Sequence, residues 1–187
     1  MKNNRLNMLY RTLIKEHYKN PSNFRVVKNA TGTFELLNPS CGDQVIVYYA
    51  LENNRITDIS FQGHGCAISV ASASIMTELI QSKTVDEAKE LITAFYELVK
   101  GNDKIDTTPL KDAVYLQGVS KFPTRIRCAT LSWHALEQGL NKNEPNMTDL
   151  EGVSGIVDWD KHENATTEEK VYQQFLMTNE VNGAIEG

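Results

Sequence analysis

An alternation of apolar and polar residues over residues 45–61 constrains the fold of this 187-residue chain more than any other feature. One face of an extended chain would carry Val45, Val47, Tyr49 and Leu51, and the other face Ile46 and Tyr48. The polar residues 52–55 predict a turn, and Ile59 and Phe61 repeat with period two on a returning strand. With a further strand over residues 32–37, the pattern predicts a three-stranded antiparallel sheet.

Helical patterns precede and follow the sheet, so the predicted fold class is α+β, with helices packed on one side of the sheet. Residues 6–19 place apolar side chains at helical spacing. Residues 67–81 mix small and apolar side chains, as expected of a helix packed closely against a sheet. Thr84 and Glu87 form a capping box that starts another helix. Further helices are predicted over residues 109–116 and 128–140, the second of them ending around Gly139.

The composition of the chain changes after Lys142. Residues 143–187 hold 10 of the 24 acidic residues but 2 of the 19 basic residues, and prolines and glycines interrupt them. We therefore predict one domain over residues 1–142 and an acidic C-terminal extension over residues 143–187, partly disordered or forming a short docked helix. The net charge of −5 removes the electrostatic drive for binding nucleic acid, so no nucleic-acid partner is expected.

The lack of a long apolar segment and the pattern of the cysteines predict a cytoplasmic protein that is not associated with a membrane. No segment combines a basic start with a long apolar run, and none approaches the roughly 20 apolar residues that cross a bilayer. The three cysteines are odd in number and widely spaced, which argues against a disulfide framework. Reduced thiols are therefore expected.

The cysteines Cys41, Cys66 and Cys128 all stand in polar or glycine-flanked contexts. Asp43 follows Cys41 by two residues, and Gly42 between them permits both side chains to point to one spot. Taken singly, each cysteine also fits a packing role and Asp43 a turn or capping role. Taken together, three sulfurs and one carboxylate oxygen suit a tetrahedral metal ion such as zinc.

Charge at this site favours a reactive metal centre over a purely structural one. Cys66 and Cys128 are placed at predicted helix beginnings, where backbone amides and the helix dipole stabilise a thiolate. Arg125 and Arg127 add positive charge beside Cys128. Three thiolates and one carboxylate outweigh the charge of a zinc ion, and a carboxylate is the hardest ligand of the set, so exchange of a ligand is physically reasonable.

Two histidines bear on the ligand set. His64 lies two residues from Cys66 and is the one plausible additional ligand, with an exposed turn residue as the alternative. His134 lies six positions after Cys128, about 240° around a helix, so it is predicted to contact the core or a partner instead.

Three motifs follow one another between Asn38 and Trp133, and together they resemble the signature of the U-type iron–sulfur cluster assembly proteins. The resemblance covers about residues 5–140, including the first predicted helix. The motifs are Asn38-Pro39-x-Cys41-Gly42-Asp43, Gly63-x-Gly65-Cys66-Ala67-Ile68-Ser69 and Arg127-Cys128-Ala129-Thr130-Leu131-x-Trp133. Arg127 stands where the scaffold members of that family carry a histidine, and residues 122–126 replace their chaperone-recognition stretch. Both features resemble the SufU branch of the family, found in Gram-positive bacteria.

The resemblance implies an IscU/SufE-like fold and a zinc ion held by Cys41, Asp43, Cys66 and Cys128. It also implies a sulfurtransferase, in which Cys41 accepts persulfide sulfur from a SufS-type cysteine desulfurase and passes it to iron–sulfur scaffold proteins downstream. Arg125 and Arg127 would support the negative site. The alternatives are a scaffold that itself holds an iron–sulfur cluster and a structural zinc domain that binds other proteins, so enzymatic activity stays an open question at this stage.

Overall fold

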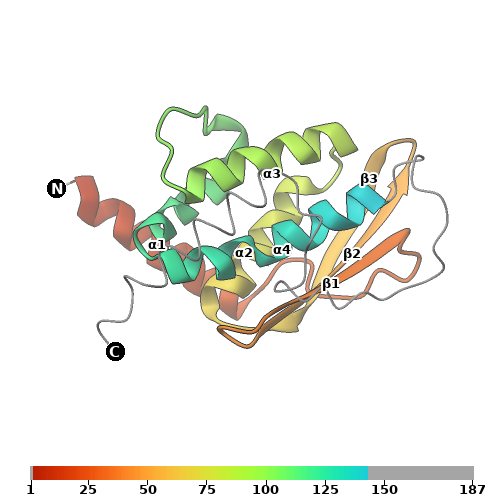
Figure 1. The fold of residues 1–187 in the computed structure, drawn as a ribbon, viewed down its shortest axis with the longest axis horizontal. Helices are drawn as coiled ribbons and strands as arrows, with labels where there is room; N and C mark the ends of the chain where they lie inside the picture. Colours follow the sequence, from red (N-terminus) through yellow and green to blue (C-terminus); the bar gives the residue numbers. More distant parts are fainter. Residues whose placement is uncertain (1, 143–187) are drawn as a thin grey trace, which may run out of the picture.

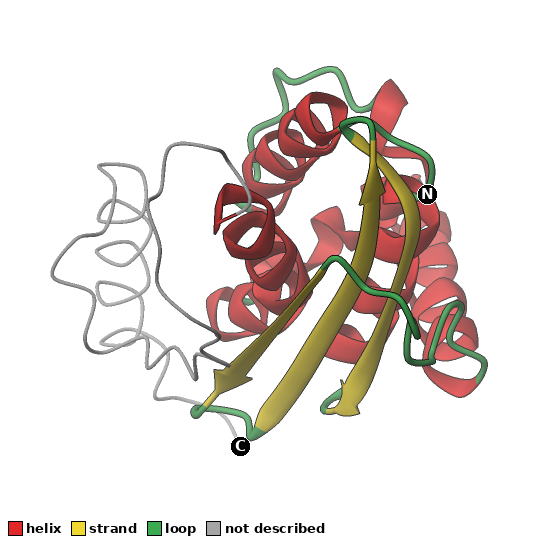
Figure 2. Ribbon diagram, turned by 90° about the vertical axis from the view of Figure 1, so that its right-hand side faces the viewer, coloured by secondary structure: helices red, strands yellow, loops and turns green. Residues whose placement is uncertain are grey.

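The computed structural model describes residues 2–142, in which helices cover one face of a small sheet (Figures 1 and 2). In chain order the elements are α1 (Lys2–Lys19), β1 (Gly32–Asn38), β2 (Asp43–Glu52), β3 (Arg55–His64), α2 (Ala67–Ile80), α3 (Val85–Val99), the 3-10 helix η1 (Thr108–Lys121) and α4 (Pro123–Lys142). The predicted α+β class is confirmed. The acidic extension predicted over residues 143–187 lies outside the described residues. Among the described residues, no helix combines the length and apolar character needed to cross a membrane.

The sheet is antiparallel, in the order β1-β2-β3. Val47 at its centre pairs with Phe34 of β1 and Phe61 of β3, and all three side chains are buried. Asn53 and Asn54 form the two-residue turn between β2 and β3 with φ of 50° and 60°, which asparagine tolerates better than most residues. The alternation in the sequence therefore predicted both the strands and the face that they bury.

Helix α2 lies at the centre of the core. Small side chains, including Ala71, Ser72 and Ala73, are fully buried and allow neighbouring elements to approach the helix closely. Trp133 of α4 donates its indole N–H to Ser72 Oγ at 2.9 Å and stacks on Phe95 of α3, with ring centroids 3.9 Å apart. These contacts fix α4 against both α2 and α3.

Polar contacts anchor helix α1 to α2. His17 Nδ1 lies 2.8 Å from Ser74 Oγ, and that hydroxyl also accepts a hydrogen bond from the backbone N–H of Ser22 at 2.8 Å. Ser22 Oγ donates to Glu78 at the same helix face. The end of α1 and the turn after it are thus held on α2, whose first turn contributes to the cysteine site.

Two helices have boundaries that differ from the predictions. The short helix predicted over residues 109–116 is a 3-10 helix that continues to Lys121, with a kink at Lys111, where φ is 46°. Helix α4 begins at Pro123, five residues before Cys128, because proline suits the first helical turn. It also continues past Gly139 to Lys142.

Candidate metal centre

The four predicted ligands come from separate elements that meet at one end of the sheet. Cys41 lies in the loop between β1 and β2 and is exposed, whereas Asp43, the first residue of β2, is fully buried. Cys66 is the N-cap of α2 and is half-buried, and Cys128 on α4 is fully buried. The exposed thiol therefore covers a group of less accessible ligands.

The ligand atoms are close enough to share an ion. Cys41 Sγ and Cys128 Sγ are 3.3 Å apart, and these two sulfurs and a carboxylate oxygen of Asp43 all lie within 4.8 Å of one another. Cys66 adjoins this group, with its Sγ 3.8 Å from Asp43 Oδ2 and hydrogen-bonded to Cys128. Zinc–sulfur bonds of about 2.3 Å place tetrahedral sulfur ligands about 3.8 Å apart. The donor set and its spacing thus fit a metal ion, and Cys41, Asp43 and Cys128 could bind one.

Asn38 organises the loop that carries Cys41. Its carbonyl accepts hydrogen bonds from the backbone N–H groups of Cys41 at 3.3 Å and Gly42 at 2.9 Å. Its buried side chain accepts from the N–H of Ser40 at 3.2 Å and directs Nδ2 at Cys128 Sγ, 3.9 Å away. Asn38 was not among the predicted site residues. The Asn38-Pro39 pair in the sequence indicates this role, because an asparagine side chain readily hydrogen-bonds to the backbone two residues further on.

Asp43 links the sheet to the beginning of α2. Its Oδ1 accepts a hydrogen bond from the backbone N–H of Cys66 at 2.8 Å, so the carboxylate satisfies a free amide at a helix N-terminus. A Cβ at Gly65 would stand 2.7 Å from the same oxygen, so glycine is required for this close approach. The other oxygen of Asp43 faces Cys66 Sγ.

The hydrogen bond between Cys66 and Cys128 separates the acidities of these two thiols. It is the main reason that the pKa of Cys66 falls to about 6, and also the main reason that the pKa of Cys128 rises, with burial as a further cause. The prediction that both thiols favour the thiolate is right for Cys66 and wrong for Cys128. Because α4 begins at Pro123, Cys128 lies in the second turn, beyond the free amides of the helix start.

Both predicted arginines lie beside the cysteines, in different ways. Arg125 is exposed and hydrogen-bonds to Cys128; this bond, with the nearby sulfurs of Cys66 and Cys41, raises the pKa of its guanidinium group. Arg127 donates from Nη1 to Ser40 Oγ at 3.2 Å and so ties α4 to the loop of Cys41.

His64 and His134 are not part of the ligand group of Cys41, Asp43 and Cys128. His64 ends β3 and is exposed. His134 is buried on α4, stacks on Tyr96 and lies 2.9 Å from its hydroxyl, as predicted for a core contact.

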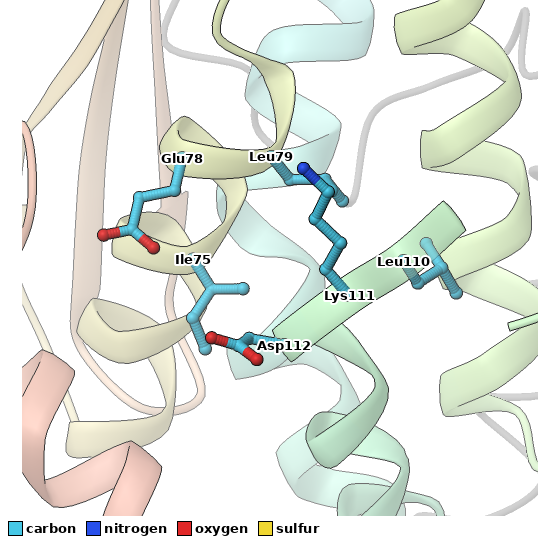
Figure 3. A pocket seen from close by; sticks show the side chains of 6 residues that line it. All are labelled: Ile75, Glu78, Leu79, Leu110, Lys111 and Asp112. Atoms are coloured by element: carbon cyan, nitrogen blue, oxygen red, sulfur yellow. The ribbon is translucent and has the colours of Figure 1, made fainter. Parts of the chain in front are cut away.

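A cleft of about 170 Å³ lies between α2 and η1 (Figure 3). Its lining residues are Ile75, Glu78, Leu79, Leu110, Lys111 and Asp112. None of them is a cysteine or a predicted ligand, so the candidate metal centre is separate from this cleft. The exposed thiol of Cys41 instead stands at the surface, within reach of a protein-sized partner.

The fold and the site together define a class: a small α+β protein with a sulfur-rich centre and one exposed thiol. Residues 9–142 match the model of the family described as "NifU-like N terminal domain". The chain therefore belongs to this family, that of the IscU- and SufU-type iron–sulfur cluster assembly proteins.

Several relatives resemble the chain over most of their length. The chain is 44% identical over 142 residues to the "Zinc-dependent sulfurtransferase SufU" of Bacillus subtilis (strain 168). This match covers 76% of the chain and 96% of that protein. The chain is also 37% identical over 147 residues to the "Iron-sulfur cluster assembly scaffold protein IscU" of Streptococcus pyogenes serotype M1. This match covers 78% of the chain and 92% of that protein.

A solved structure has the same fold. It is the crystal structure of a putative iron–sulfur cluster assembly scaffold protein for the SUF system, from Fervidobacterium islandicum AW-1. The TM-score is 0.67 at 34% sequence identity, and the match covers 71% of this chain and 97% of the other.

Proposed function

We propose that this protein is a zinc-dependent sulfurtransferase, which accepts persulfide sulfur on Cys41 from a SufS-type cysteine desulfurase and passes it to scaffold proteins of iron–sulfur cluster assembly. The observation that carries the proposal is the exposed Cys41 thiol, 3.3 Å from the buried sulfur of Cys128 and within a group that fits a metal ion. The sulfurtransferase name of the Bacillus subtilis relative supports it. Free thiols of this kind suit a reducing, cytoplasmic setting.

The proposed zinc ligands are Cys41, Asp43, Cys66 and Cys128. When bound, zinc would keep the cysteine sulfurs deprotonated at neutral pH and shield them from other reactions. Asp43 and Cys128 are fully buried, whereas Cys41 is exposed on a loop, so Cys41 is the ligand best placed to leave. Arg125 and Arg127 would balance the negative charge that remains.

The transfer step uses the Cys41 thiolate as nucleophile. It attacks the outer sulfur of the desulfurase persulfide, so that a new sulfur–sulfur bond forms on Cys41 while the bond within the donor persulfide breaks. The desulfurase cysteine leaves as a thiolate, and the transferred sulfur stays on Cys41 as a persulfide. The positive charge of Arg125 beside the cysteines would favour the anionic nucleophile.

The test measures sulfur on Cys41 directly. The zinc-loaded protein is incubated with a SufS-type desulfurase and cysteine, and intact-mass and peptide analysis should find one added sulfur atom on Cys41, together with faster alanine release. Cys41→Ala should show neither effect, while Thr33→Ala, a change at an exposed position on β1, should behave as the unmodified protein. Full stimulation of the desulfurase by Cys41→Ala would contradict the proposal.

A second candidate function is a scaffold on which an iron–sulfur cluster is built. It is favoured by the three closely spaced sulfurs and by the scaffold name of the Streptococcus pyogenes relative. Anaerobic reconstitution with iron and sulfide separates the two functions. A stable visible chromophore that moves to an apo-acceptor would support the scaffold, and retention of zinc without a chromophore would support the sulfurtransferase.

A further inference from the structure

Helix α1 presents a basic stripe, defined as Met8, Arg11, Lys15 and Lys19. At 100° per residue these four positions fall within an arc of about 80°, so their side chains share one face of the helix. All four are exposed, Met8 at 64%. The opposite side of α1 packs on α2, for example through His17, whose Nδ1 lies 2.8 Å from Ser74 Oγ. The stripe therefore faces away from the core.

The positive charge of the domain is concentrated on this helix. Residues 2–19 contain five basic residues and one acidic residue, whereas residues 20–142 contain 12 basic and 13 acidic residues. Within the described part of the chain, no hydrogen bond or ion pair engages Arg11, Lys15 or Lys19. The exposed charges of α1 are thus available to an acidic partner.

The chain itself supplies such a partner after the family domain. The family match ends at residue 142, and residues 143–187 carry a net charge of −8. The densest acidic stretch spans residues 158–169, where Asp158, Asp160, Glu163, Glu168 and Glu169 stand against one lysine. Trp159 lies within the same stretch and is one of only two tryptophans in the chain.

We propose that the acidic stretch 158–169 docks on the basic stripe of α1 within the same molecule. The carboxylates would pair with Arg11, Lys15 and Lys19, and Trp159 would cover the exposed Met8 thioether. This interaction surface is separate from the four predicted ligands and does not depend on the proposed sulfur transfer.

The length of the intervening chain permits the contact. From Lys142 the path back along the 20 residues of α4 is about 30 Å at 1.5 Å per residue. Helix α1 packs on α2 and α2 packs on α4, so α1 lies two helix spacings, about 20 Å, further. The 16 residues from Lys142 to Asp158 span up to about 55 Å when extended. The contact therefore requires no change in the described domain.

Carbodiimide cross-linking of the full-length protein tests the proposal, because this reagent joins a lysine amine to a carboxylate only where the two touch. A mixture of unlabelled and 15N-labelled protein is cross-linked, digested and analysed by mass spectrometry. We expect Lys15 and Lys19 to be joined to residues 158–169 in peptide pairs of a single isotope, which identifies contacts within one molecule. The yield should fall sharply in about 1 M salt, where the Debye length is about 3 Å.

Two variants sharpen the test without removing the reporter groups. Arg11→Gln should lower the yield of these cross-links about two- to fivefold, the range expected for loss of an exposed ion pair. Lys28→Gln, a matched change at another exposed cation, should leave the yield unchanged. Lys28 and Lys104 are exposed control lysines, and cross-link yields there equal to those of the stripe would overturn the proposal. Mixed-isotope pairs, which join two copies of the chain, would overturn it as well, and so would the absence of any cross-link from the stripe.

Discussion

Asp43 is the residue on which two functions converge, because one oxygen caps α2 through the Cys66 N–H and the carboxylate also belongs to the proposed ligand set. Substitutions at this residue should separate the two roles. Asp43→Asn keeps an oxygen in place to accept the hydrogen bond but loses the negative charge. We expect its zinc affinity to fall at least about tenfold, by analogy with changes around metal ligands, while its free energy of unfolding in chelator stays close to that of the unmodified protein.

Asp43→Ala is the matched comparison, because it removes both roles. It should lose zinc affinity and also about 1–3 kcal/mol of unfolding free energy in chelator, since the partly buried N–H of Cys66 loses its acceptor. Competition with a chromophoric chelator measures the affinity, and urea unfolding measures the stability. If Asp43→Asn bound zinc as tightly as the unmodified protein, Asp43 would not be a ligand.

At this scale the proximity of the predicted site residues followed from the sequence, whereas the acidity of their thiols did not. Cys41, Asp43, Cys66 and Cys128 stand in motifs whose chemistry is visible in the sequence. The structure brings Cys41, Asp43 and Cys128 into one group and places Cys66 beside Asp43. The acidity of Cys128 depends instead on its depth in the fold and on its bond to Cys66, neither of which is encoded in its local neighbours. The role of Asn38 likewise required the close approach of α4 to the Cys41 loop.

Among the elements, α4 shows how a glycine can be mistaken for a helix end. The sequence predicted a stop near Gly139, but the helix continues, and the glycine leaves space for the buried ring of Tyr49 from β2. A Cβ at Gly139 would stand 2.8 Å from Tyr49 Cε1. The strands could be predicted from the alternation within one segment of the sequence. The role of Gly139 depends instead on Tyr49, which lies 90 residues away in the sequence.

Gly139→Ala should therefore destabilise the protein despite the higher helix propensity of alanine. The added methyl group overpacks the contact between α4 and the sheet, at a cost of about 1–3 kcal/mol. Gln138→Ala, on the same helix turn and only half-buried, is expected to change the unfolding free energy by less than about 0.5 kcal/mol. Urea denaturation monitored by circular dichroism would distinguish the two. A more stable Gly139→Ala would show that the ring of Tyr49 moves aside without cost.

Helices α3 and α4 are also joined by a pH-sensitive cluster. The hydroxyl of Tyr96 donates to Glu137 Oε2 at 2.8 Å, and His134 Nδ1 lies 3.5 Å from the same carboxylate. Burial is the largest influence on Glu137 and raises its pKa, but His134, Tyr96 and the charge of Lys89 together outweigh it, so the pKa is lowered overall. The stabilisation is then complete above the unfolded pKa of about 4.3 and is lost as the pH falls below it.

Glu137→Gln should remove this dependence. We expect the variant to be less stable than the unmodified protein near neutral pH, and the difference in unfolding free energy to shrink as the pH falls from about 5 to about 3. Urea unfolding in chelator across this range measures it, with the exposed Glu90→Gln as the control. A difference that is constant with pH would mean that the charge of Glu137 does not contribute.

On the scale of the whole molecule, the proposed zinc site ties together parts that are otherwise joined by packing and by a few hydrogen bonds, such as those of Asp43 and Arg127. Its ligands come from the loop after β1, the start of β2, the N-cap of α2 and the second turn of α4. An ion that binds the folded state and not the unfolded one stabilises it by mass action. At free zinc about 100 times the dissociation constant, this amounts to about 2.7 kcal/mol.

Removing zinc with a chelator should consequently lower the melting temperature of the full chain by roughly 5–10 °C. Cys66→Ser is the informative variant, because it keeps the N-cap position but replaces a half-buried sulfur ligand, so most of the zinc-dependent shift should disappear. Ser82→Ala, at an exposed position in the turn after α2, should retain the full shift. Calorimetry with and without zinc measures all three proteins. An unchanged shift in Cys66→Ser would place the ion on the group of Cys41, Asp43 and Cys128 alone, with the helix cap outside the coordination sphere.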